Sequence, residues 1–111
     1  MRGLLRLLRI NQAFIEHQRE INAAIINTFL GAAFWGDLDA QPLSIAELSK
    51  ELGVAPTTVS RHLRYLGDGI RDGKPGMGLI ATFPHPEDAR NKVIRLTEAG
   101  RDLRNQLAAY L

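Results

Sequence analysis

The stretch from residue 44 to residue 66 constrains the fold most strongly, because it predicts two short helices joined by a three-residue turn. Ser44 and Glu47 form a capping box, in which the two side chains satisfy free amides at a helix start. Gly53 is suited to end that helix in a left-handed conformation. Pro56 suits the first position of the next helix, where its ring fixes a helical φ. This pattern indicates a helix-turn-helix, with an ordinary helical hairpin in a bundle as the alternative.

The second of these helices is predicted over 56–66 and has two distinct faces. The inward stripe follows the i, i+4, i+7 spacing of a buried face and consists of Val59, Leu63 and Leu66. The outer face presents hydroxyl side chains and arginines, namely Thr57, Thr58, Ser60, Arg61 and Arg64. Short hydroxyl residues allow close approach to phosphates and base edges, and an arginine can pair bidentately with guanine. We therefore expect this face to bind DNA in a major groove, the alternative being a plain solvated face.

A glycine-rich loop over 67–78 leads from the second helix into a predicted hairpin. The segments 79–83 and 92–96 read as short strands, and the turn-rich segment 84–91 lies between them. A two-stranded hairpin that follows a helix-turn-helix is a wing, so we predict a wing over 79–96.

The tip of this wing carries the second group of candidate DNA-binding residues. Arg90 is the candidate for insertion into a minor groove, where negative potential favours arginine. Asp88 is placed to orient Arg90 through a salt bridge, and Lys92 is a further candidate DNA contact. The alternative is a tip arginine that is simply exposed to solvent.

The first 35 residues are helical in pattern, and their first part is rich in leucine. Asn22 is suited to cap a second helix, and Thr97 to cap a last helix over 97–111. The first helix offers more apolar surface than a lone solvent-facing helix should expose, through Leu4, Leu7, Leu8 and Phe14. We therefore predict that residues 1–20 form a dimerisation helix that pairs together with the last helix in a homodimer.

Composition limits the function classes. A chain of 111 residues with 45% hydrophobic content fits one mostly helical domain over 1–111. The absence of cysteine excludes a disulfide framework and a thiolate metal site, and the histidines His17, His62 and His85 have no ligand spacing. His62, beside the inward stripe, is expected to be a packing or phosphate-contacting residue. With no nucleophile–base pair or phosphate loop, we expect neither an enzyme nor a bound cofactor.

Charge is distributed unevenly along the chain. The formal net charge is only +2, but residues 54–95 carry seven basic and four acidic side chains. Such a segment can concentrate a polyanion on one face, a mixed solvated surface being the alternative. Arg6 and Arg9 interrupt the apolar opening, which argues against a secretory signal, and no apolar run is long enough to span a membrane. We expect a cytoplasmic protein without a membrane partner.

The segment 86–101, PEDARNKVIRLTEAGR, resembles the wing-and-helix signature of MarR-type transcriptional regulators. In that family an Asp and Arg pair marks the wing tip, and a Leu-Thr-Glu-x-Gly-Arg run opens the next helix. Residues 43–48 and 58–61 match the family's helix-turn-helix, and 57–66 would also suit the ArsR family. The resemblance covers residues 21–111. It implies sequence-specific binding of double-stranded DNA by a homodimer, and it allows a small-molecule effector.

The sequence also departs from the family's pattern. Ala89 stands where the family often has the first of two adjacent arginines, the loop 67–78 is longer than usual, and one C-terminal helix stands where two are common. Because those C-terminal helices build the family's dimer, we expect the leucine-rich first helix to take over much of the dimerisation. The prediction is a mainly α winged helix-turn-helix with a small two-stranded β wing. The alternative function is a protein-interaction subunit of a larger complex, docked through its apolar first helix.

Overall fold

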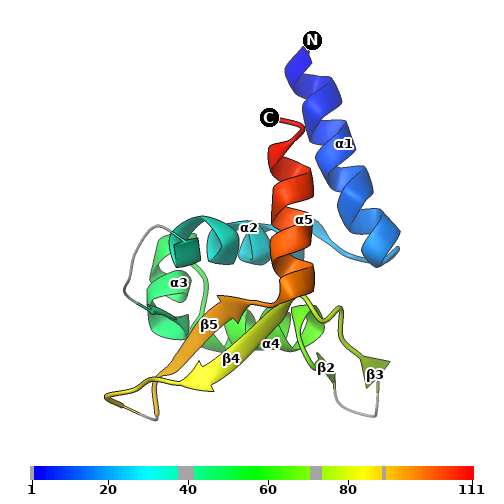
Figure 1. The fold of residues 1–111 in the computed structure, drawn as a ribbon. Helices are drawn as coiled ribbons and strands as arrows, with labels where there is room; N and C mark the ends of the chain where they lie inside the picture. Colours follow the sequence, from blue (N-terminus) through cyan, green and yellow to red (C-terminus); the bar gives the residue numbers. More distant parts are fainter. Residues whose placement is uncertain (1, 38–41, 71–73, 89) are drawn as a thin grey trace.

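The computed structural model describes residues 2–37, 42–70, 74–88 and 90–111 (Figure 1). The elements follow in the order α1 (Arg2–His17), α2 (Ala23–Asp37), β1 (Leu43–Ser44), α3 (Ile45–Leu52), α4 (Pro56–Leu66), β2 (Gly69–Ile70), β3 (Lys74–Pro75), β4 (Ile80–Pro84), β5 (Lys92–Leu96) and α5 (Glu98–Ala108). The helices α3 and α4 form the helix-turn-helix, and β4 and β5 form the wing. The predicted winged-helix fold is confirmed.

The helix boundaries arise from the local signals in the sequence. Ser44 Oγ accepts a hydrogen bond from the Glu47 amide at 3.0 Å and donates to Glu47 Oε1 at 3.1 Å. The return bond of this capping pair therefore ends on the Ser44 hydroxyl rather than on its amide. Gly53 ends α3 with a φ of 69°, which glycine adopts without steric cost, and Pro56 is at the start of α4. Asn22 Oδ1 accepts from the Ile25 amide at 3.0 Å, so it caps α2 as predicted.

The sheet contains one strand more than the sequence predicted. Its order is β1-β5-β4, all antiparallel, with Leu43 opposite Ile94 and Thr82 opposite Ile94 on the other side. The two residues of β1 are too few to show any periodicity, and their partner β5 lies about fifty positions away in the chain. The loop predicted over 67–78 is also more regular than expected, because β2 and β3 pair within it.

The core gathers residues from every helix and from the base of the wing. Its largest fully buried side chains are Phe14, Phe29, Leu48, Leu66, Leu79, Ile80 and Leu103. The rings of Phe14 and Phe29 meet edge to face at 5.4 Å, a favourable aromatic geometry that fixes the end of α1 against α2. The predicted inward stripe of α4 is buried, which turns the opposite face of this helix outward.

The molecule has two ends of different character (Figure 1). The helices α1 and α5 lie side by side and project from one end, whereas α4 and the wing occupy the other end. Phe14 was predicted to be part of the exposed apolar surface of the first helix, and this was wrong, because it is fully buried in the chain's own core. Leu4, Leu7 and Leu8 are more than half exposed. In the part of the chain that the structure describes, no helix is both long and apolar enough to cross a membrane.

Candidate nucleic-acid interface

The outer face of α4 carries the candidate residues predicted from the sequence. Thr57, Arg61 and Arg64 are exposed, while Thr58 and Ser60 are half-buried. Positions 57, 60, 61 and 64 are spaced three or four residues apart and therefore share one side of the helix. The first turn of α4 contains no acidic residue. The positive end of its helix dipole thus remains uncompensated, which favours an approaching anion.

The C-terminal end of α4 is held by the segment that returns from β3, residues 77–79. The amides of Met77, Gly78 and Leu79 donate to the carbonyls of Tyr65, Gly67 and Leu66 at 3.0, 3.1 and 2.8 Å. These bonds satisfy carbonyls that a helix end would otherwise leave without partners. We call residues 77–79 the strap.

The strap also binds the start of α5. Leu79 O accepts from the Thr97 amide at 3.0 Å, and Gly78 O accepts from Thr97 Oγ1 at 2.6 Å. Thr97 Oγ1 in turn accepts from the Gly100 amide at 3.0 Å and so caps α5 as predicted. The backbone contact is close, because a Cβ on Gly100 would lie 2.0 Å from Leu79 O. Through the strap, the position of α4 is fixed relative to both the wing and α5.

His62 ties the inner side of α4 to α2. Its Nδ1 lies 2.8 Å from the buried Thr28 Oγ1, which also donates to Ala24 O at 3.2 Å. Since the single hydroxyl hydrogen of Thr28 is used by Ala24, His62 Nδ1 is the donor in this pair. Burial lowers the pKa of His62, and the neighbouring Arg61 lowers it further. His62 is therefore a mostly neutral packing residue near pH 7. Within the described ranges, no group of three or more acidic or histidine side chains is arranged to hold a metal ion.

At the wing tip, Asp88 and Arg90 are paired. Asp88 Oδ1 lies 3.5 Å from Arg90 Nε and accepts from the Arg90 amide at 3.1 Å. The Arg90 side chain is 95% exposed, so this pairing orients it without removing it from solvent. Ala89, where the sequence departs from the family's arginine pair, lies outside the described residues.

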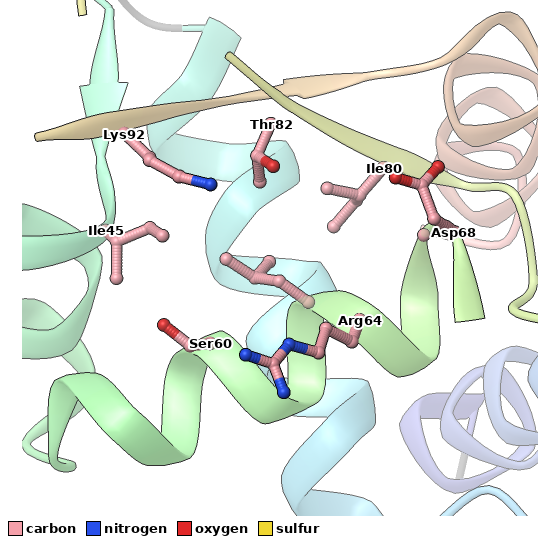
Figure 2. Close-up of a pocket in the computed structure, with 9 residues that line it drawn as sticks. Ile45, Ser60, Arg64, Asp68, Ile80, Thr82 and Lys92 are labelled. Carbon is pink, nitrogen blue, oxygen red and sulfur yellow. The ribbon is translucent and has the colours of Figure 1, made fainter. Parts of the chain in front are cut away.

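A cavity of about 240 Å³ separates α4 from the wing (Figure 2). It is lined by Ile45, Ser60, Leu63, Arg64, Gly67, Asp68, Ile80, Thr82 and Lys92. Three of the predicted site residues, Ser60, Arg64 and Lys92, thus come together at one place. Thr82 and Asp68 were not predicted as site residues. No local pattern marks them, since they join the others only because the hairpin folds back beside α4.

The wing tip does not share this cavity. Lys92, at the start of β5, lines the cavity, whereas Asp88 and Arg90 do not. The candidate residues therefore fall into an outer α4 face, a cavity between α4 and the wing, and a separate exposed tip.

Comparison with known proteins identifies the helix-turn-helix first. The sequence model described as bacterial regulatory protein, arsR family, matches residues 38–68, which contain α3 and α4. This match covers a short part of the chain and marks the helix-turn-helix alone. No curated protein matches the sequence significantly.

Solved structures identify the fold of nearly the whole chain as that of MarR-family regulators. A MarR-family transcriptional regulator from Rhodococcus sp. RHA1 aligns with a TM-score of 0.63 at 20% identity, over 97% of this chain and 66% of that chain. CouR from Rhodococcus jostii RHA1, bound to p-coumaroyl-CoA, aligns with a TM-score of 0.63 at 22% identity, over 97% and 66%. A point mutant of MarR from E. coli, complexed with operator DNA, gives 0.64 at 19% identity, over 96% and 68%.

These likenesses confirm the resemblance to MarR-type regulators at the level of the fold. Sequence identities of 19–22% show a shared fold only. The chain spans about two thirds of the length of the regulators it matches.

Proposed function

We propose that this chain is a sequence-specific DNA-binding transcriptional regulator that acts as a homodimer. The helix α4 would enter the major groove, and the wing tip 84–91 would enter the adjacent minor groove. The observation that carries this proposal is the row of hydroxyls and arginines on α4, of which Thr57, Arg61 and Arg64 are exposed, at the same end of the molecule as the wing (Figure 1). A neighbour of the same fold, MarR from E. coli, was solved on operator DNA.

Each candidate residue has a role in this proposal. Arg61, exposed in the middle of α4, reads a base edge, since an arginine pairs bidentately with guanine. Thr57, Thr58 and Ser60 donate to phosphates or bases at the start of the helix, while Arg64 and Lys92 contact phosphates. Arg90 enters the minor groove, oriented by Asp88.

The homodimer is supported by the surface of α1. Its exposed apolar side chains are Leu4, Leu5, Leu7, Leu8 and Ile15, each between 47% and 63% exposed. A contiguous apolar surface on a soluble protein marks an interaction site. Because α5 lies beside α1, we place both helices in the interface. A two-fold dimer of this kind would read a pseudo-palindromic site.

A small-molecule effector is part of the proposal, because CouR, a neighbour of the same fold, was solved with p-coumaroyl-CoA. A protein-interaction subunit is the second candidate, and the same apolar surface of α1 favours it.

Selection from random duplex DNA tests the function. We expect the enriched sites to be pseudo-palindromic, with half-site centres about 10 base pairs or a multiple of that apart. Their affinity at physiological salt should exceed that for scrambled duplexes by at least about a thousandfold. Equal binding to enriched and scrambled duplexes over a range of salt concentrations would favour the protein-interaction subunit instead.

A further inference from the structure

The space between α4 and the wing has a defined relation to a DNA duplex. The wall between a major groove and the neighbouring minor groove is one sugar-phosphate strand. A protein that places a helix in one groove and a wing in the next must therefore let that strand pass between them. In this chain the cavity of about 240 Å³ lies between the two elements (Figure 2).

The chemistry of the cavity suits an anion. Arg64 from α4 and Lys92 from β5 are exposed, and neither has an ion-pair or hydrogen-bond partner among the described side chains. The Ser60 and Thr82 hydroxyls add neutral donors from the same two elements. In Figure 2 the Lys92 ammonium points from the strand into this space, and the Arg64 guanidinium lies along α4 on the side of Ser60.

The cavity is also firmly built. Leu63 and Ile80 line it and are 4% and 2% exposed, so core packing fixes these lining positions. The strap fixes the end of α4 next to the base of β4. The two cations are therefore held on elements that cannot separate without disturbing the core, which favours a preorganised site.

We propose that this cavity seats a single backbone phosphate of bound DNA, shared between Arg64 and Lys92, with Ser60 and Thr82 as hydroxyl donors. The inference rests on the proposed function and adds that one phosphate joins the helix contact to the wing contact. Asp68 also lines the cavity and repels any anion there, so the two cations and this carboxylate together leave a single positive charge, which suits one phosphate rather than two. The shared phosphate distinguishes this arrangement from separate contacts of the two cations with two phosphates.

A double-mutant cycle tests the sharing. We expect Arg64→Gln and Lys92→Gln each to weaken binding to a selected site by about tenfold per half-site, the scale of one charge-assisted contact. The double variant should lose clearly less affinity than the product of the two single losses, and its salt slope should fall by roughly one unit per half-site rather than two. Arg64→Gln combined with Arg90→Gln is the matched control, and its losses should multiply, because Arg90 does not line the cavity.

Duplexes with single neutral methylphosphonate linkages locate the phosphate. With one neutral linkage at the proposed phosphate in each half-site, the duplex should bind the wild type as weakly as the unmodified duplex binds Lys92→Gln. The same neutral linkage should not weaken binding by Lys92→Gln or Arg64→Gln any further. Thr82→Val should lose affinity while Thr82→Ser retains it. Losses that multiply at every linkage, or a salt slope that falls by two units per half-site in the double variant, would overturn the shared phosphate and leave the DNA-binding function intact. Failure of the wild type to bind any duplex would overturn both.

Discussion

The end of α4 and the first half of α1 differ in how much of their surface this chain itself buries. At the end of α4, Leu66 is fully buried and the strap pairs the last carbonyls of the helix with amides at 2.8–3.1 Å. On α1, Leu4 is 63% exposed and Leu8 is 52% exposed. The burial and hydrogen bonding at the end of α4 are supplied by a single copy of the chain. The first half of α1 has an apolar face that one copy leaves exposed, so the proposed DNA contacts and the proposed dimer contacts lie at opposite ends of the molecule.

The largest expected effect comes from the α1 leucines. Replacing Leu4, Leu7 and Leu8 together by Gln should weaken the proposed dimer at least about a hundredfold, because each buried leucine contributes about 1.5–3 kcal/mol and every change occurs twice. Sedimentation at several protein concentrations measures the dissociation constant. These positions are exposed, so the fold should persist. An unchanged dimer would remove α1 from the interface.

A deletion of residues 1–15 is a less selective test of the same interface. It would remove Phe14, which is fully buried against Phe29, together with the exposed leucines. A monomer or an aggregate formed by that variant would then reflect damage to the core as much as loss of the interface. The triple substitution leaves Phe14 in place.

The next effect concerns the strap. Gly100→Ala places a Cβ 2.0 Å from Leu79 O, a backbone atom that cannot move aside cheaply. We expect a loss of about 3 kcal/mol in the free energy of unfolding, within the range for overpacking a tight backbone contact. Urea unfolding measures it. The matched control is Gly3→Ala on α1, where a Cβ meets nothing within 4 Å and helix propensity should improve slightly. Equal unfolding midpoints for the two variants would show that the strap tolerates displacement.

The features that the sequence predicted are local ones, and those that it missed depend on contacts between distant segments. The Ser44 and Thr97 caps, the Gly53 ending and the buried face of α4 depend on residues a few positions apart, so local patterns were enough. The pairing of β1 with β5 joins segments far apart in the chain, and no local pattern encodes it.

The burial of Phe14 shows a second limit. Leu7 and Phe14 are seven residues apart and so lie on nearly the same face of α1, yet Leu7 is 59% exposed and Phe14 is buried against Phe29 of α2. The period groups residues into faces but does not tell how far along α1 the chain's own core extends. The cavity beside Thr82 was missed for a related reason, since it exists only where two elements meet.

Within the recognition end, Arg61 should matter more for specific than for non-specific binding. It is exposed on the outer face of α4, and losing one bidentate base contact costs about 1–3 kcal/mol. Affinities of Arg61→Ala for a selected site and for random duplex DNA measure the difference. Equal losses on both would reassign Arg61 to a phosphate.

The smallest effect is expected at the wing tip, because Arg90 is 95% exposed and is held by one carboxylate. If it enters the minor groove, its contact is electrostatic and depends on groove width, so it should favour narrow A·T-rich flanks. Arg90→Ala should lower the salt slope by roughly one unit per half-site and remove the flank preference. Asp88→Ala should cause a smaller loss of affinity, since Asp88 orients the arginine without touching DNA.

Binding at several salt concentrations, on sites that differ only in A·T-rich or G·C-rich flanks, separates these effects. Unchanged affinity, slope and flank preference in Arg90→Ala would mean that the tip does not reach the duplex, and recognition would then rest on α4 and the cavity beside it.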